Sequence, residues 1–177
     1  MKSNYVHIGG VVKDNVERDL AQACATLGYK AALKAYQKHS FKHRTHNLHD
    51  SYGSAVYLNG KLVPETIRYV NRARSTTDDT RRGRTNGRKA LEDFLRTAWV
   101  VNKRDYITIL VVAAMWYGKI LEEKKYIVLP YEEVKATIVS EFDSTILPVL
   151  KKHKIESFLP VLRRGLGADM TYYRENR

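Results

Sequence analysis

The sequence predicts an α+β fold in which a long N-terminal helix and a C-terminal helix pack on a small antiparallel β-sheet, with a long basic loop. Three observations lead to this prediction. Apolar residues recur every three or four positions after Asp14 and again after Pro130. Between these segments lie runs rich in β-formers, one of which is closed by an Asn59-Gly60 turn. The stretch from Arg68 to Lys89 carries eight basic residues in 22 positions, without apolar periodicity after Val70.

The first helix is predicted to open the fold, because Asp14 and Asn15 are both favoured N-cap residues. One apolar stripe follows at helical spacing: Val16, Leu20, Cys24, Leu27, Ala31 and Ala35. Cys24 lies in this stripe, so it is interpreted as a small buried hydrophobe rather than a nucleophile. As the single cysteine, it also excludes an intrachain disulfide framework and a multi-thiolate zinc site.

A β-hairpin is predicted next. Ser51–Leu58 is rich in β-formers, Asn59-Gly60 is a favoured two-residue turn, and Lys61–Val63 begins the returning strand. Pro64 cannot donate a ladder hydrogen bond, so the returning strand is expected at a sheet edge or with a bulge. Glu65–Val70 is expected to resume it.

Lys89–Ala98 is predicted to be a short helix and Tyr106–Ala114 the strongest strand. Both faces of this strand are apolar, so we expect both to be covered. The first helix would cover one face. The other face would be covered either by another layer of this chain or by a neighbouring subunit, and the sequence leaves these two alternatives open.

A brief strand is predicted at Tyr126–Leu129, and Pro130 suits the first turn of the last long helix. The apolar stripe of that helix is expected to contain Val134, Ile138, Phe142 and Ile146, and Pro148 is expected to end or kink it. Residues 1–153 are therefore interpreted as one α+β domain with an inserted Arg-rich loop at 71–88, and residues 154–177 as an appended C-terminal arm.

The charge of the chain favours an anionic partner and limits the class of protein. The 177 residues carry a formal net charge of +12, and residues 1–89 hold 17 of the 31 Lys and Arg but only 7 of the 19 Asp and Glu.

The longest apolar run, Tyr106–Tyr117, has 12 residues. A bilayer span needs about 18 to 20. We therefore expect a soluble protein without a membrane partner, made in the cytoplasm.

The basic loop supplies the candidate contacts with a partner or with nucleic acid, because Arg is the side chain that best fits phosphate groups. A solvated surface loop is the equally open alternative. The candidate residues are Arg68, Arg72, Arg74, Arg81, Arg82, Arg84, Arg88 and Lys89.

Four of the six histidines lie close together, at positions 39, 43, 46 and 49. His39 and His43 are one helical turn apart if the first helix reaches them, which is the spacing of a zinc pair. However, no HExxH motif accompanies them, and the flanking Lys42 and Arg44 repel a cation. A polar loop is favoured, and a metal site that includes His46 and His49 stays open. Without a suitably placed carboxylate pair, GxSxG motif or phosphate loop, we expect neither an enzyme nor a cofactor.

Within the segment from Ala31 to Val63, the residues between helix and hairpin form a recognisable pattern: Thr45, Asn47, Leu48, Asp50 and Ser51, followed by the turn at Asn59 and Gly60. The segment resembles the tail-completion (head–tail joining, or minor tail) proteins of tailed bacteriophages. Those proteins pass from an amphipathic helix through a T-G-x-L-x-x-S element into a β-hairpin. Here His46 stands where the family usually has Gly.

A second similarity is Tyr106–Glu123, in which Trp116-Tyr117-Gly118 and Glu122 follow a strand. It is similar to the family's strand followed by YA-x-x-x-E, which precedes a long C-terminal helix. The resemblance covers residues 14–70 and 105–150, and the basic stretch Arg68–Lys89 and the arm Ile155–Arg177 are additions to that core.

The resemblance implies a structural virion protein of the phage neck. It would form a homo-oligomeric ring that joins the portal or adaptor and capsid to the tail, around the channel through which the genome DNA passes. A closed ring needs apolar faces beyond the core of each subunit, and Tyr106–Ala114 is expected to supply one. The alternative is a stand-alone basic nucleic-acid-binding protein that uses the Arg-rich loop.

Overall fold

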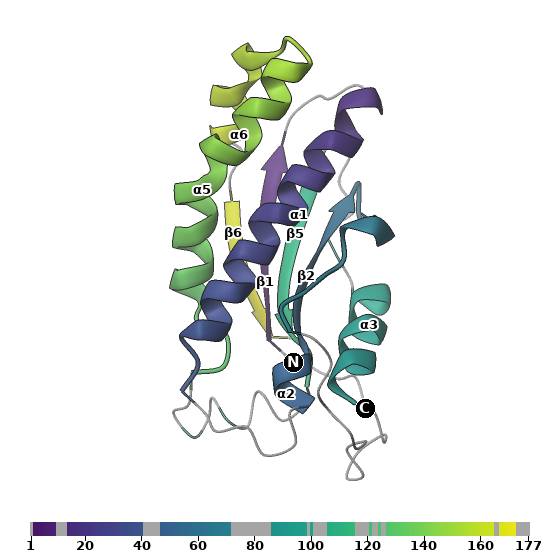
Figure 1. The fold of residues 1–177 in the computed structure, drawn as a ribbon, viewed down its shortest axis with the longest axis vertical. Helices are drawn as coiled ribbons and strands as arrows, with labels where there is room; N and C mark the ends of the chain where they lie inside the picture. The colour runs from purple at the N-terminus through teal and green to yellow at the C-terminus, as the bar shows by residue number, and fades with distance from the viewer. Residues whose placement is uncertain are drawn as a thin grey trace.

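The computed structural model of the protein describes residues 2–9, 14–40, 47–71, 86–98, 100, 106–115, 121, 124, 127–164 and 167–172. Within these ranges the chain has the predicted α+β fold (Figure 1). The helices are α1 (Asp14–Gln37), α2 (Asn47–Asp50), α3 (Gly87–Thr97), α5 (Tyr131–Lys152) and α6 (Leu159–Arg164), with 3-10 turns η1 (Pro64–Thr66) and η2 (Glu156–Phe158). The strands are β1 (Lys2–Gly9), β2 (Tyr52–Leu58), β3 (Lys61–Leu62), β4 (Arg68–Tyr69), β5 (Tyr106–Ala113) and β6 (Gly167–Tyr172).

The strands form one antiparallel sheet in the order β3-β2-β5-β1-β6, and β4 also pairs with β2. The strongest predicted strand, β5, lies in the centre. It runs against β2 from Ile107 opposite Leu58 to Ala113 opposite Tyr52. The sheet is therefore organised around the segment that the sequence marks as most apolar.

The first and last described segments, β1 and β6, belong to the sheet, which corrects two predictions. A strand, β1, precedes α1, so the long helix does not open the fold. Residues 154–177 are not simply an appended arm, because β6 pairs with β1 from Gly167 opposite His7 to Tyr172 opposite Lys2. The hydrogen-bonding partners of β1 lie about a hundred residues or more away in the sequence, and local patterns do not reveal such pairings.

The predicted hairpin is confirmed. Asn59 and Gly60 have φ values of 51° and 76°, and two positive values in succession are the signature of the type I′ turn that matches the twist of β-strands. Gly60 suits this position because it has no Cβ to oppose a positive φ. The returning strand is short, and η1 begins at Pro64, after which β4 resumes the pairing.

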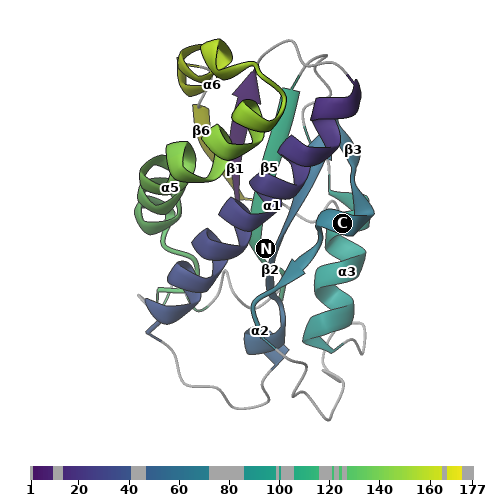
Figure 2. The same cartoon turned by 45° about the horizontal axis from the view of Figure 1, so that its top comes forward.

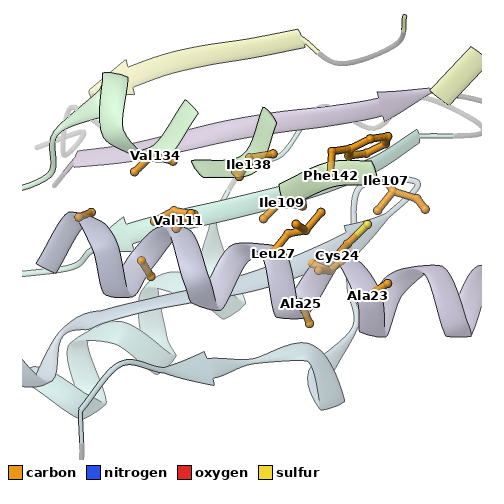
Figure 3. Close-up of a cluster of buried hydrophobic side chains, with 14 of the residues drawn as sticks. Ala23, Cys24, Ala25, Leu27, Ile107, Ile109, Val111, Val134, Ile138 and Phe142 are labelled. Carbon is orange, nitrogen blue, oxygen red and sulfur yellow. The ribbon is translucent and has the colours of Figure 1, made fainter. Parts of the chain in front are cut away.

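One face of the sheet is covered by α1 and α5, which lie side by side (Figure 1). Figure 3 shows Cys24 and Leu27 of α1 near Ile107 and Ile109 of β5, with Phe142 of α5 above them. All five side chains are buried. Burial of one large apolar side chain is worth roughly 1.5 to 3 kcal/mol, so this layer supplies a substantial part of the driving force for folding.

The opposite face of β5 is covered by α3, which settles an alternative that the sequence leaves open. Leu110 and Val112 pack in a second cluster with Leu91, Phe94 and Leu95 of α3. The cover comes from this chain, so the expectation that β5 offers an apolar face to a neighbouring subunit is wrong. The reason is that α3 is itself amphipathic and needs this surface to bury its apolar side.

The last long helix, α5, buries its predicted stripe but does not end at Pro148. The side chains of Val134, Ile138, Phe142 and Ile146 are at most 1% exposed. Pro148 lies inside the helix, which continues to Lys152. The fully buried Leu150 lies beyond Pro148, and its packing helps to hold the last turn despite the donor that Pro148 lacks.

The strand predicted at Tyr126–Leu129 is not formed over the described residues 127–129. This segment is instead tied to the end of α1 and to β2. Ser40 N donates to the carbonyl of Ile127 at 3.1 Å, and Ile127 N donates to Ser40 Oγ at 2.8 Å. The hydroxyl of Tyr52 donates a hydrogen bond to the carbonyl of Val128.

Candidate functional site

The residues between α1 and the hairpin form a compact buried turn. Asn47, Leu48, His49, Asp50 and Ser51 are all buried, the first four of them in α2. The hydroxyl of Ser51 donates to the carbonyl of Leu48 at 2.8 Å, and the Leu48 side chain packs in the core below α1. Four residues of the family resemblance thus lie in one turn, whereas Thr45 lies outside the described residues.

His49 and Asp50 form a buried polar pair within this turn. Their Nδ1 and Oδ1 atoms are 2.8 Å apart, and the two side chains are only 7% and 0% exposed. The ring of Tyr36 stands edge-on to His49, with centroids 5.2 Å apart, and also packs against Tyr52. The histidine therefore belongs to the packed interior of the turn.

The other histidines considered as metal ligands form no metal site within the described residues. His39 packs on Tyr36, with ring centroids 4.7 Å apart, while His43 and His46 lie outside these residues. Over the described ranges, no three His, Cys, Asp or Glu side chains are grouped so that they could hold a metal ion.

Both ends of the Arg-rich segment are fastened to this turn. Gly87 N donates to Asn47 Oδ1 at 3.1 Å, and Asn71 Nδ2 donates to the carbonyl of His49 at 2.9 Å. Arg88 then joins the two ends, because its guanidinium donates to the carbonyl of Asn71 at 2.7 Å. We call these four contacting positions, Asn47, Asn71, Gly87 and Arg88, the clasp.

Gly87 is required by the closeness of this contact. A Cβ atom at position 87 would lie 1.8 Å from the carbonyl oxygen of Asn47, and any side chain would therefore push α3 away from α2. Asn86 caps α3 next to it, since its side chain accepts from Lys89 N at 2.8 Å. The helix thus begins at Gly87, two residues before the predicted start, and Arg88 and Lys89 belong to its first turn.

Two of the candidate contact residues are engaged within the subunit. The guanidinium of Arg88 lies 3.6 Å from the centre of the Tyr69 ring, a cation–π contact. Arg68 donates to Gln22 Oε1 at 2.8 Å and to the carbonyls of Glu65 and Ile67. These two arginines therefore hold β4 in place.

Tyr69 links this contact to the body of α3. Its hydroxyl donates to Glu92 Oε1 at 2.9 Å. Burial, followed by the hydrogen bond and the charge of Glu92, raises the pKa of Tyr69 above its usual value. The ring consequently stays neutral under ordinary conditions and offers its face to Arg88.

The structure brings together some predicted site residues and not others. At the clasp Asn47 accepts from Gly87 and Arg88 donates to Asn71, and Leu48, Asp50 and Ser51 lie next to Asn47 in the same turn. Lys89 is exposed beside the clasp, and the Asn59-Gly60 turn lies at the other end of β2. Five candidate contacts lie outside the described residues: Arg72, Arg74, Arg81, Arg82 and Arg84.

Sequence reasoning missed Tyr69, Asn71 and Gly87. The sequence feature that could have identified them is their position at the two borders of the Arg-rich stretch. A polar residue or a glycine where a helix or strand pattern ends often marks an anchored end of a loop.

A second set of charged contacts joins α1 to α5 on the other side of the molecule. Lys30 Nζ lies 2.8 Å from Glu141 Oε2. Asp19 Oδ2 lies 2.6 Å from Lys152 Nζ and 2.8 Å from His153 Nε2. The hydrogen bonds from Lys152 and His153 lower the pKa of the Asp19 carboxyl.

No protein-family model matches the chain, and neither a curated protein nor a solved structure matches it. Among the described helices, none combines the length and the apolar composition that crossing a bilayer requires.

Proposed function

We propose that this protein is a ring-forming subunit of the neck of a tailed bacteriophage. It joins the portal or adaptor to the tail and surrounds the channel of the genome DNA. The protein is then a structural part of the virion, without catalytic activity.

The buried turn from Asn47 to Ser51 is the observation that carries this proposal. The resemblance to the tail-completion proteins falls on these residues, and they are packed and hydrogen-bonded at the junction of α1 and the hairpin. Residues in such positions determine how a helix enters a sheet. A resemblance that falls on them concerns the architecture of the subunit rather than its variable surface.

The order of elements supports the same proposal. The long helix α1, the turn, the β2–β3 hairpin, the central strand β5 and the long helix α5 follow each other in the order that the resemblance implies. The YG-containing segment of the second similarity, residues 116–120 and 122, lies outside the described residues.

Nucleic-acid binding through the Arg-rich segment is the competing function. Eight basic residues in 22 positions favour it, but Arg68 and Arg88 are already held by contacts within the subunit. Asp78 and Asp79 also lie within the segment, and they would repel a phosphate backbone.

The two functions are separated by where the protein is found and by what it binds. Mass spectrometry and electron microscopy of purified virions should locate it at the neck in several copies. In solution it should bind duplex DNA only weakly. Absence from virions, together with tight DNA binding whose log K falls steeply with log salt, would reject the neck function in favour of the nucleic-acid-binding one.

A further inference from the structure

The sequence holds two Asn-Gly pairs, and the fold places them in very different surroundings. Asn59-Gly60 forms the turn between β2 and β3, and Asn86-Gly87 forms the start of α3. In both pairs a residue without a Cβ follows the asparagine, so the next backbone nitrogen is sterically open to approach. An asparagine in this setting can react with its own main chain and lose ammonia, a covalent change that needs only water.

The Asn59-Gly60 turn leaves the reacting nitrogen accessible. Both residues are half-buried, and within the described ranges the Gly60 nitrogen donates to no acceptor. The turn fixes rotation about the Cα–C bond of Asn59, so the reaction proceeds only when the turn opens. Opening is local, because β3 has only the two residues Lys61 and Leu62 and pairs with β2 alone, at the edge of the sheet (Figure 2). The pairing of β2 with β5 can persist meanwhile.

The Asn86-Gly87 pair is locked on both sides. The Gly87 nitrogen is buried and donates to Asn47 Oδ1 at 3.1 Å. The side-chain oxygen of Asn86 accepts from Lys89 N at 2.8 Å as the cap of α3. A Cβ atom at position 87 would lie 1.8 Å from the carbonyl oxygen of Asn47, so α2 packs directly on this backbone. Any rotation that brought the Gly87 nitrogen to the Asn86 side chain would break the cap and open the clasp.

We propose that Asn59 is a site of spontaneous deamidation and that the fold protects Asn86 from the same reaction. In the open turn the Gly60 nitrogen gives its proton to hydroxide and attacks Cγ of Asn59. The new N–C bond closes a cyclic succinimide, and the side-chain nitrogen leaves as ammonia with a proton taken from water. A water molecule then breaks one of the two C–N bonds of the ring. Cleavage at Cγ gives aspartate, and cleavage at the main-chain carbonyl gives isoaspartate.

The two products affect the hairpin differently. In isoaspartate the main chain runs through Cβ, so the turn gains one atom and no longer matches the pairing of Leu58 with Lys61. The aspartate product keeps the ordinary main chain, and aspartate tolerates a positive φ such as the 51° of Asn59. Both products carry the same added negative charge, so a difference in stability between them reports the altered main chain.

Ageing of the intact protein in mildly alkaline buffer tests the proposal, with Asn86 as the internal control. Trypsin separates the two pairs, because Lys61 follows one and Arg88 the other, and mass spectrometry then measures the deamidated fraction of each peptide. In the folded protein Asn59 should react at least about tenfold faster than Asn86. In guanidinium chloride the two asparagines should react at similar rates, because each is followed by glycine.

Two variants refine the test. Asn47→Ala removes the acceptor of the Gly87 nitrogen, so it should raise the rate at Asn86 several-fold and leave the rate at Asn59 unchanged. Thermal melting checks that this variant folds, and if it does not, the comparison of the two sites in the parent still decides. The isoaspartate form of the aged protein, isolated by chromatography, should melt below Asn59→Asp, which carries the same charge on an ordinary main chain.

Two results would overturn the proposal. Reaction of Asn86 as fast as that of Asn59 in the folded protein would show that the clasp gives no protection. An unmodified Asn59 in the folded protein, under conditions that convert the denatured chain, would show that the turn does not open locally. Equal melting of the isoaspartate form and Asn59→Asp would contradict the altered hairpin.

Discussion

The hydroxyl of Thr66 accepts a hydrogen bond from the backbone nitrogen of Val56 at 3.0 Å and donates one to the carbonyl of Val63 at 2.6 Å. On the outer edge of β2, β4 pairs with the N-terminal part and β3 with the C-terminal part. Thr66 lies between them and gives Val56 the acceptor that neither short strand provides. The Thr66 side chain thus completes the row of hydrogen bonds along the outer edge of β2.

Replacing Thr66 by Val should destabilise the protein although it preserves the shape of the side chain. The change leaves the buried N–H of Val56 without an acceptor, which costs about 1 to 3 kcal/mol. Urea denaturation measures the loss. Thr26→Val is the matched control, because Thr26 is exposed and bonds only within α1, and it should change the free energy of unfolding by less than about 0.5 kcal/mol. Equal effects of the two changes would contradict the role of Thr66.

Replacing Gly87 by Ala should separate α3 from α2. The added Cβ would overlap the carbonyl of Asn47, and overpacking of this kind costs about 1 to 3 kcal/mol. Chemical denaturation should report the loss, and limited proteolysis should report faster cleavage between α2 and α3. Lys89→Ala, an exposed change in the same helical turn, should have little effect on either measurement. A fully stable Gly87→Ala variant would show that the contact is not needed.

Burial raises the pKa of the Cys24 thiol from its ordinary value of 9.0 to about 12. The unfolded chain therefore loses this proton first. The stabilisation by the neutral thiol is complete below pH 9 and is lost progressively as the pH rises toward 12, by about 1.4 kcal/mol per pH unit. Urea denaturation at several pH values should show a steeper decline in the parent than in Cys24→Ala, whose other titrating groups, the raised Tyr69 among them, are the same.

The same burial predicts that Cys24 is unreactive in the folded state. A thiol reagent should label the denatured chain quickly and the native protein only at the rate of unfolding, because only an accessible thiolate attacks the reagent and the buried thiol is neutral. Rapid labelling of the native protein would place Cys24 on the surface and contradict the packing of α1.

Replacing Asp19 by Asn should loosen the contact between the start of α1 and the end of α5. The lowered pKa of Asp19 means that its carboxylate stabilises the folded state above its ordinary pKa of 3.8, and that this stabilisation is lost as the pH falls through the folded value. The variant should therefore be less stable than the parent at neutral pH, with the difference disappearing under strongly acidic conditions. Glu65→Gln, at an exposed position, serves as the control in the same thermal melting series. A difference that persists in acid would exclude the ion pair as its cause.

Changing Arg81, Arg82 and Arg84 to Ser should leave the melting temperature unchanged and reduce incorporation into virus particles. We expect the effect to be larger at high salt, where the remaining charge pairs are screened. The control removes three exposed lysines elsewhere, at positions 38, 61 and 151, and should assemble normally. Normal assembly of the arginine variant would mean that the segment is only solvated surface. A collapsed fold would mean that it belongs to the core.

The sequence by itself determined those parts of the protein whose physical cause is local. The stripe from Val16 to Ala35 positions α1 because residues at helical spacing share one face. Asn59-Gly60 sets the hairpin because its two residues accept positive φ values. The apolar run of β5 and the amphipathic α3 and α5 were predictable for the same reason.

The tertiary structure decided what depends on partners distant in the sequence. The strand β1 exists because it pairs with β5, and β6 because it pairs with β1; the sequence around them carries no comparable pattern. Leu91, Phe94 and Leu95 cover the second face of β5. No local sequence pattern could show whether this cover comes from the same chain or from a neighbouring subunit. The clasp likewise joins Asn47, Asn71 and Arg88 across more than 40 positions, because hydrogen-bond geometry in a packed turn depends on the whole fold rather than on residue spacing.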